Sequence, residues 1–205
     1  GIISLTSAGN YDFQQQATEE SRLTRLADDL NSVAPLETTS ADWPTYRADN
    51  QRSGASTAKV AHQVNKAWEL KPASAVDPAA PIAVGDLVFA TGSDGAVRAL
   101  DAETGQPRWT AFTSGAIKYP PSVSQGRLIV GSCDGYVYAF EAATGRALWK
   151  FRAAPQERII SVYGSLSSTW PVASGTLVDD GLVYAAAGIA SYDGTHVYAL
   201  DAKTG

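Results

Sequence analysis

A repeat with a period of 40 residues is the feature that most constrains what this chain can fold into. Residues 96–109 recur at 136–149, and the same pattern begins again in residues 195–205. Gly145 of the second copy and Gly205 of the third are 60 residues apart, so the third repeat contains about twenty extra residues. A fixed period of this length predicts a repeat architecture.

Short antiparallel strands are predicted in each copy. In the first copy they lie at Pro81–Val84, Leu87–Ala90, Ala96–Leu100 and Arg108–Phe112, with a tight turn at Ser93–Gly95. The second copy repeats them at Leu128–Val130, Tyr136–Phe140 and Leu148–Phe151. Four short strands in about forty residues are typical of one blade of a β-propeller. We therefore predict an all-β fold, a β-propeller of four-stranded antiparallel blades, of which 205 residues supply only about three to four.

The beginning of the chain differs from the repeats. We predict an N-terminal extension at residues 1–40 and a partial propeller at 41–205. From Thr18 onward the apolar residues follow a helical spacing. They are Leu23, Leu26, Leu30 and Val33. We expect one short amphipathic helix that stops at Pro35, because proline cannot continue a helix. A single strand is predicted at residues 66–70, around Trp68.

The residues that recur most faithfully are interpreted as structural. Pairs such as Asp94-Gly95 suit type I′ turns better than calcium loops, which need several oxygen ligands within about a dozen residues. The glycine of the Thr-Gly pair permits a sharp bend, and the tryptophan packs between neighbouring blades. The predicted docking residues are Asp101, Thr104, Gly105 and Trp109, then Glu141, Thr144, Gly145 and Trp149, and finally Asp201 and Gly205.

Residues 99–109 and their copies resemble the tryptophan-docking repeat of the PQQ-like (pyrroloquinoline-quinone-like) β-propellers. That family includes quinoprotein dehydrogenases and the propeller lipoprotein of outer-membrane protein assembly. Residues 42–47, followed by 52–54, are similar to the opening segment of many such propellers. The resemblance implies a ring of about eight blades. It also implies a periplasmic, cell-surface or extracellular location.

The predicted blades are too few to close such a ring. An open blade would present unpaired backbone and a bare apolar face. We therefore expect another chain, another copy or further residues to complete the propeller. Because the sequence contains no methionine and opens with glycine, we do not expect residue 1 to be a translation start.

Composition argues against two classes of partner. The chain has 16 basic and 21 acidic side chains and no basic run, which disfavours nucleic acid. No apolar run approaches the roughly 20 residues of a membrane-spanning helix.

Ligand-binding loops are predicted where the third repeat is longer than the second. The extra residues fall in 153–170 and in 187–192, two loop types that lie on one face of a propeller. Contacts for an anion, a sugar or a planar ring are Arg158, Tyr163, Trp170, Ser191 and Tyr192. Alternatively, residues 153–170 form a self-packed plug of the central channel. In that case Ile159, Ile160 and Val162 point inward.

No catalytic group, cofactor site or metal site is predicted. His62 lacks a nearby carboxylate or cysteine, and His196 takes the place of Tyr136 one repeat earlier, on a strand surface. The resemblance implies that quinoprotein dehydrogenases cap the quinone with adjacent cysteines, and Cys133 is the single cysteine here. Two hypotheses remain. One is a noncatalytic scaffold that binds or assembles proteins at the cell envelope or surface; the other is a segment of a PQQ-dependent dehydrogenase that holds PQQ and calcium.

Overall fold

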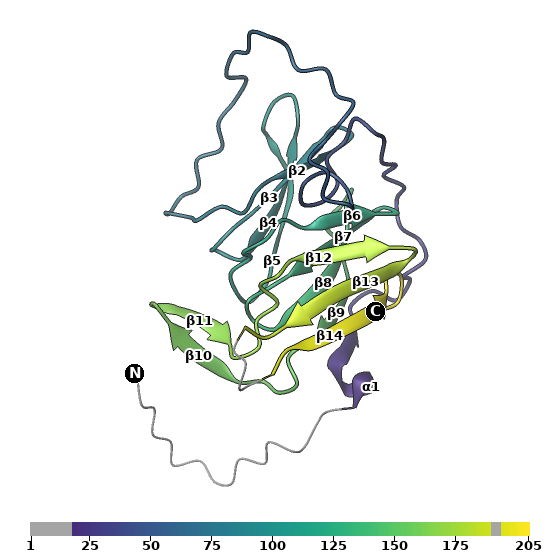
Figure 1. Ribbon diagram of the computed structural model, residues 1–205, viewed down its shortest axis with the longest axis vertical. Helices are drawn as coiled ribbons and strands as arrows, with labels where there is room; N and C mark the ends of the chain where they lie inside the picture. Colours follow the sequence, from purple (N-terminus) through teal and green to yellow (C-terminus); the bar gives the residue numbers. More distant parts are fainter. Residues whose placement is uncertain (1–17, 190–193) are drawn as a thin grey trace.

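The computed structural model describes residues 18–189 and 194–205. Its described strands are short and antiparallel, and they form successive sheets (Figure 1). This arrangement confirms the all-β prediction. No helix within the described ranges is long and apolar enough to cross a membrane.

The first sheet, blade 1, has the order β2-β3-β4-β5. Its strands are β2 (Ile82–Val84), β3 (Leu87–Thr91), β4 (Ala96–Asp101) and β5 (Pro107–Phe112). Blade 2 repeats this order with β6 (Ser122–Ser124), β7 (Arg127–Gly131), β8 (Tyr136–Glu141) and β9 (Ala147–Arg152). The register repeats as well, since the tryptophan of the fourth strand pairs with an alanine of the third, Ala99 with Trp109 and Ala139 with Trp149.

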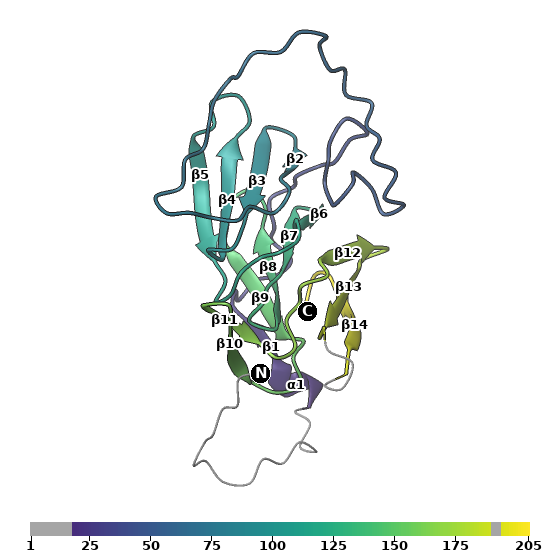
Figure 2. The ribbon, with the colours of Figure 1, turned by 60° about the vertical axis from the view of Figure 1, so that its left-hand side comes forward.

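Blade 3 contains three described strands in the order β12-β13-β14. They are β12 (Thr176–Asp179), β13 (Leu182–Ala187) and β14 (His196–Asp201). A separate hairpin, β10 (Ile159–Val162) and β11 (Ser165–Ser168), precedes this blade. In Figure 2 the sheets of blades 1, 2 and 3 follow one another around the body.

The N-terminal prediction was wrong from Leu23 onward. The helix α1 covers only Glu19–Arg22, and β1 (Leu23–Arg25) pairs antiparallel with β9 as a fifth strand of blade 2. The buried Arg22 donates from Nη1 to Tyr198 Oη of blade 3 at 2.8 Å. The open edge of β9 offers unpaired backbone groups, and pairing with them outweighs the weak helical preference of a short segment.

The predicted strand at residues 66–70 was also wrong, because the structure assigns no strand there. Trp68 nevertheless behaves as a repeat residue. Its Nε1 donates to Ala102 O at 2.9 Å, and its indole lies against Gly105.

The same contact recurs at each step between blades. Trp109 Nε1 donates to Ala142 O at 3.0 Å, and Trp149 Nε1 donates to Ala202 O at 3.3 Å. At Gly145 the backbone has φ +76°, and an added Cβ would lie 2.6 Å from the indole of Trp109. Only glycine combines this backbone conformation with so close an approach.

Each docking turn is held by a carboxylate. Asp101 Oδ1 accepts from Thr104 N and Thr104 Oγ1, both at 2.8 Å. Asp201 Oδ1 makes the same two contacts with Thr204. Glu141 is longer and accepts from Thr144 Oγ1 while its other oxygen accepts from Ala34 N of the N-terminal segment.

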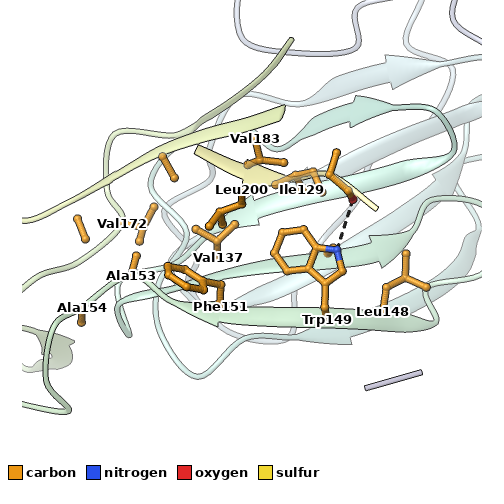
Figure 3. Packing of buried hydrophobic residues seen from close by; sticks show 14 of the residues in the cluster. Ile129, Val137, Leu148, Trp149, Phe151, Ala153, Ala154, Val172, Val183 and Leu200 are labelled. Atoms are coloured by element: carbon orange, nitrogen blue, oxygen red, sulfur yellow. Dashed lines mark hydrogen bonds between the residues drawn. The ribbon is translucent and has the colours of Figure 1, made fainter. Parts of the chain in front are cut away.

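Apolar clusters fill the wedges between the blades. Figure 3 shows the wedge between blades 2 and 3, where Trp149 and Phe151 of β9 lie with Val183 and Leu200 of blade 3. A second cluster joins blades 1 and 2 around Phe89. The core is therefore divided by the middle sheet.

Residues 43–50 cross the first strands of all three blades. The backbone of this segment forms a bridge with Ala83 of β2 and accepts from Val123 N of β6 at 2.8 Å. Asn50 Nδ2 donates to Val178 O of β12 at 2.9 Å. The segment thereby ties the blades together along one side.

Candidate functional site

The insertion of the third repeat forms a hairpin that stands apart from the blades (Figure 1). Its turn is Tyr163-Gly164, with φ of +49° and +82°, which fits the type I′ geometry of two-residue hairpins. The expectation that Ile159, Ile160 and Val162 point inward in a self-packed loop was wrong, because all three side chains are exposed in these blades.

Both faces of this hairpin carry exposed apolar side chains. Side chains alternate along a strand, and directly paired residues share a face. The register Ser161 with Leu166 places Leu166, 67% exposed, on the face of Ile159, 51% exposed. Ile160 and Val162 occupy the opposite face.

The base of the hairpin is fixed to blade 2. Ser168 N donates to Cys133 O at 2.7 Å, and Thr169 N donates to Arg158 O at 2.9 Å. Ser168 Oγ accepts from Trp170 N. An exposed arm is thus mounted on a rigid sheet, an arrangement common in binding loops.

The predicted ligand contacts that the structure describes do not converge on one surface. Trp170 is buried in the wedge between blades 2 and 3, and the Arg158 guanidinium lies 5.6 Å from the centre of its ring. Tyr163 is fully exposed at the tip of the hairpin. Ser191 and Tyr192 lie outside the described residues.

The groups beside the base are held protonated at neutral pH. Asp134 Oδ2 accepts from Tyr138 Oη at 2.6 Å. Burial of the Tyr138 hydroxyl is the largest cause that raises its pKa, and the negative charge of Asp134 is the second. Burial and the hydrogen bond to Glu157 raise the pKa of Tyr136 to about 12. Burial raises the pKa of the Cys133 thiol as well. The two tyrosine hydroxyls act as positioned donors.

Charge is distributed unevenly around the hairpin. No charged residue occurs from Ile159 to Val178. Three basic residues, Lys150, Arg152 and Arg158, lie at the end of β9 and in the segment that leads to the hairpin.

A cleft of about 650 Å³ lies on another part of the molecule. It is lined by several residues between 38 and 57, by Ser122, Val123 and Ser124 of β6 and by Val178 of β12. Its carboxylates are engaged in local bonds, for example Asp42 with Thr39 N and with Gly85 N. No group of three or more His, Cys, Asp or Glu side chains in the described part of the chain is arranged to hold a metal ion.

One face of blade 3 is apolar and exposed although its counterpart in blade 2 is buried. Val137 of β8 is 0% exposed, whereas Val197, sixty residues later in β14, is 73% exposed. Ile129 of β7 is 0% exposed, whereas Tyr184, at the corresponding place in β13, is 41% exposed. In blade 2 this face carries the next blade.

The fold is that of a sector of a β-propeller, with successive four-stranded blades joined by docked tryptophans. A family model described as "Outer membrane protein assembly factor BamB" matches residues 47–205. The chain therefore belongs to this family of PQQ-like β-propellers, which confirms the resemblance seen in the sequence.

The relatives come from two branches of the family. The outer membrane protein assembly factor BamB of Burkholderia pseudomallei is 31% identical, over 35% of this chain and 29% of its own length. The quinohemoprotein alcohol dehydrogenase ADH IIB of Pseudomonas putida is 34% identical, over 35% of this chain and 12% of its own length. The chain thus spans less than a third of these relatives.

Solved structures show the same fold. The quinohemoprotein alcohol dehydrogenase of Comamonas testosteroni superposes with a TM-score of 0.64 at 23% identity, covering 80% of this chain and 26% of that protein. A europium-containing methanol dehydrogenase gives a TM-score of 0.63 at 17% identity, covering 83% of this chain and 31% of that protein. The chain is a partial propeller, about a quarter to a third of such structures.

Several features of the site were missed from the sequence. The hairpin was signalled by the alternating pattern around Tyr163-Gly164, and the Trp68 contact by its spacing of 41 residues from Trp109. The repeat alignment shows which residues of blade 3 correspond to buried residues of blade 2. Which face of blade 3 is covered can be seen only in a structure.

Proposed function

We propose that this chain is part of a noncatalytic propeller that serves as a protein-binding or assembly scaffold in the cell envelope. The family relationship supports an envelope location in general. The docking residues, Asp101, Glu141 and Asp201 with their turns and tryptophans, hold successive blades in register. The binding surfaces are the faces and loops that these blades present.

The observation that carries the proposal is the exposed apolar face of blade 3. Val197 and Tyr184 are equivalent to residues that blade 2 buries against its neighbour. An apolar sheet face of this kind marks a protein-packing surface. The occupant is a further blade, supplied by another chain, another copy or another part of the polypeptide.

The test is a Val197→Asp substitution in the intact protein, with Val60→Asp as the matched control. Val60 is 83% exposed and belongs to no blade. If a blade covers Val197, burying the new charge lowers the free energy of unfolding by about 3 kcal/mol or more. Equal effects of about 0.5 kcal/mol or less in both variants would contradict the proposal.

A dehydrogenase segment is the competing assignment, because quinohemoprotein alcohol dehydrogenases are among the relatives. Titration of the intact protein with PQQ and calcium, followed by desalting, separates the two functions. A scaffold retains no quinone absorbance. Retention of stoichiometric quinone would favour the dehydrogenase.

A further inference from the structure

The hairpin β10–β11 carries apolar side chains that no other part of these blades covers. An isolated two-stranded hairpin is marginally stable in water. Here every residue of β10 is exposed, and Tyr163 and Leu166 extend the apolar surface to the tip and to β11. An apolar surface of this extent marks a contact with something other than water.

The distribution of the apolar residues identifies the kind of contact. A protein surface packed on one side of the hairpin would cover either Ile159 and Leu166 or Ile160 and Val162. A lipid interface surrounds an inserted hairpin and covers both faces at once. Tyrosine at the tip fits the same environment, because an amphipathic ring is favoured at the level of the headgroups.

Charge at the base complements an anionic surface. Lys150, Arg152 and Arg158 lie next to the uncharged hairpin, and none of the residues from Ile159 to Val178 is acidic. Two acids lie nearby, Glu157, which accepts from Tyr136 Oη, and Asp134, which accepts from Tyr138 Oη, so the three basic residues exceed the acidic ones by one. Basic residues close to a membrane surface are attracted by anionic lipids.

We propose that the hairpin β10–β11 docks on a lipid surface, with its apolar tip in the interfacial layer and its basic base against anionic headgroups. Insertion stops at the interface, because the outer edges of a two-stranded hairpin expose backbone groups that hydrocarbon cannot satisfy. This inference goes beyond the scaffold function and does not depend on the face of blade 3.

The first test is sedimentation of the intact protein with vesicles of phosphatidylcholine and phosphatidylglycerol. The double variant Ile160→Ser/Leu166→Ser removes one apolar residue from each face, and Val60→Ser/Val64→Ser removes two valines elsewhere that are more exposed than either. The hairpin variant is expected to bind at least about tenfold more weakly, and the control like wild type. Absence of binding by wild type, or equal loss in both variants, would overturn the proposal.

The charge contribution is tested separately with Arg152→Gln. On anionic vesicles this change is expected to weaken binding about fivefold, the effect of about 1 kcal/mol per basic residue. On pure phosphatidylcholine it has no effect. An equal loss on both vesicle types contradicts the electrostatic contribution.

A labelled Ser165→Cys variant distinguishes lipid from protein as the occupant. The native Cys133 is buried, so within residues 1–205 a thiol-reactive, polarity-sensitive dye attaches at the hairpin alone. The dye is expected to react readily without vesicles and to shift its emission when they are added. Protection from labelling in the intact protein without vesicles would show that protein covers the hairpin and would overturn the proposal.

Discussion

Each tryptophan of the repeat joins two blades through a packed ring and one hydrogen bond. Trp149 is completely buried, and its indole lies among side chains of blades 2 and 3 (Figure 3). Its N–H reaches Ala202 O in the turn of blade 3. The side chain of Trp149 thus provides both the apolar packing between the two blades and the hydrogen bond to Ala202 O.

The two contributions of Trp149 are separable by substitution. Trp149→Ala is expected to lower the free energy of unfolding by about 3–5 kcal/mol, because it empties a closed wedge. Trp149→Phe keeps an aromatic ring and is expected to cost clearly less, although it also leaves Ala202 O without its donor. Urea denaturation of both variants measures the difference. A loss below about 1 kcal/mol for Trp149→Ala would contradict the wedge assignment.

The carboxylates of the docking turns make stability depend on pH. Burial acts to raise the pKa of Glu141, but hydrogen bonds from Ala34 N, Thr144 Oγ1 and Arg146 outweigh it and hold the pKa below the ordinary 4.5. A lowered folded-state pKa stabilises the fold above the unfolded-state value, and this contribution is lost as pH falls through the folded-state value.

Glu141→Gln removes this titration. Between about pH 6 and pH 3, wild type is expected to lose more free energy of unfolding than the variant. Urea denaturation at several pH values provides the comparison. Parallel pH profiles for the two proteins would show that Glu141 does not contribute through its charge.

At the scale of elements, the conformation of the hairpin β10–β11 depends on its turn. Gly164 has φ +82°, which valine adopts only under strain. Gly164→Val is therefore expected to open the hairpin and speed amide exchange in β10 and β11. Tyr163→Asn places the favoured Asn-Gly pair in the turn and is expected to slow exchange. Unchanged exchange in both variants would contradict the turn assignment.

The elements with strict repetition were predictable from the sequence, and those without it were not. The strands containing Val97 and Val137 follow from short, mostly apolar runs and from matched turns. By contrast, the leucine spacing at Leu23 and Leu26 is compatible with a helix, and only the free edge of β9 selects a strand there. Trp170 was predicted to contact a ligand, but the structure buries it between blades 2 and 3. The sequence does not reveal contacts between blades, so this burial could not be predicted.

At the scale of the whole molecule, the described residues form three consecutive blades of a larger ring. Residues 43–50 and the docked tryptophans connect these blades into one body. On one face, blade 3 exposes Val197 and Tyr184. Their counterparts in blade 2, Val137 and Ile129, are buried against the next blade. Blades 1 and 2 each place a fourth strand beside the third strand, whereas β14 has only β13 as a described neighbour.

Amide hydrogen exchange along β14 in the intact protein tests this account most directly. The amides of β14 that do not bond to β13 point toward the position of a fourth strand. If the propeller is completed there, these amides exchange as slowly as those of β8, which has a strand on both sides. Fast exchange along that edge, in a folded and monomeric protein, would contradict the account of this chain as a sector of a larger ring.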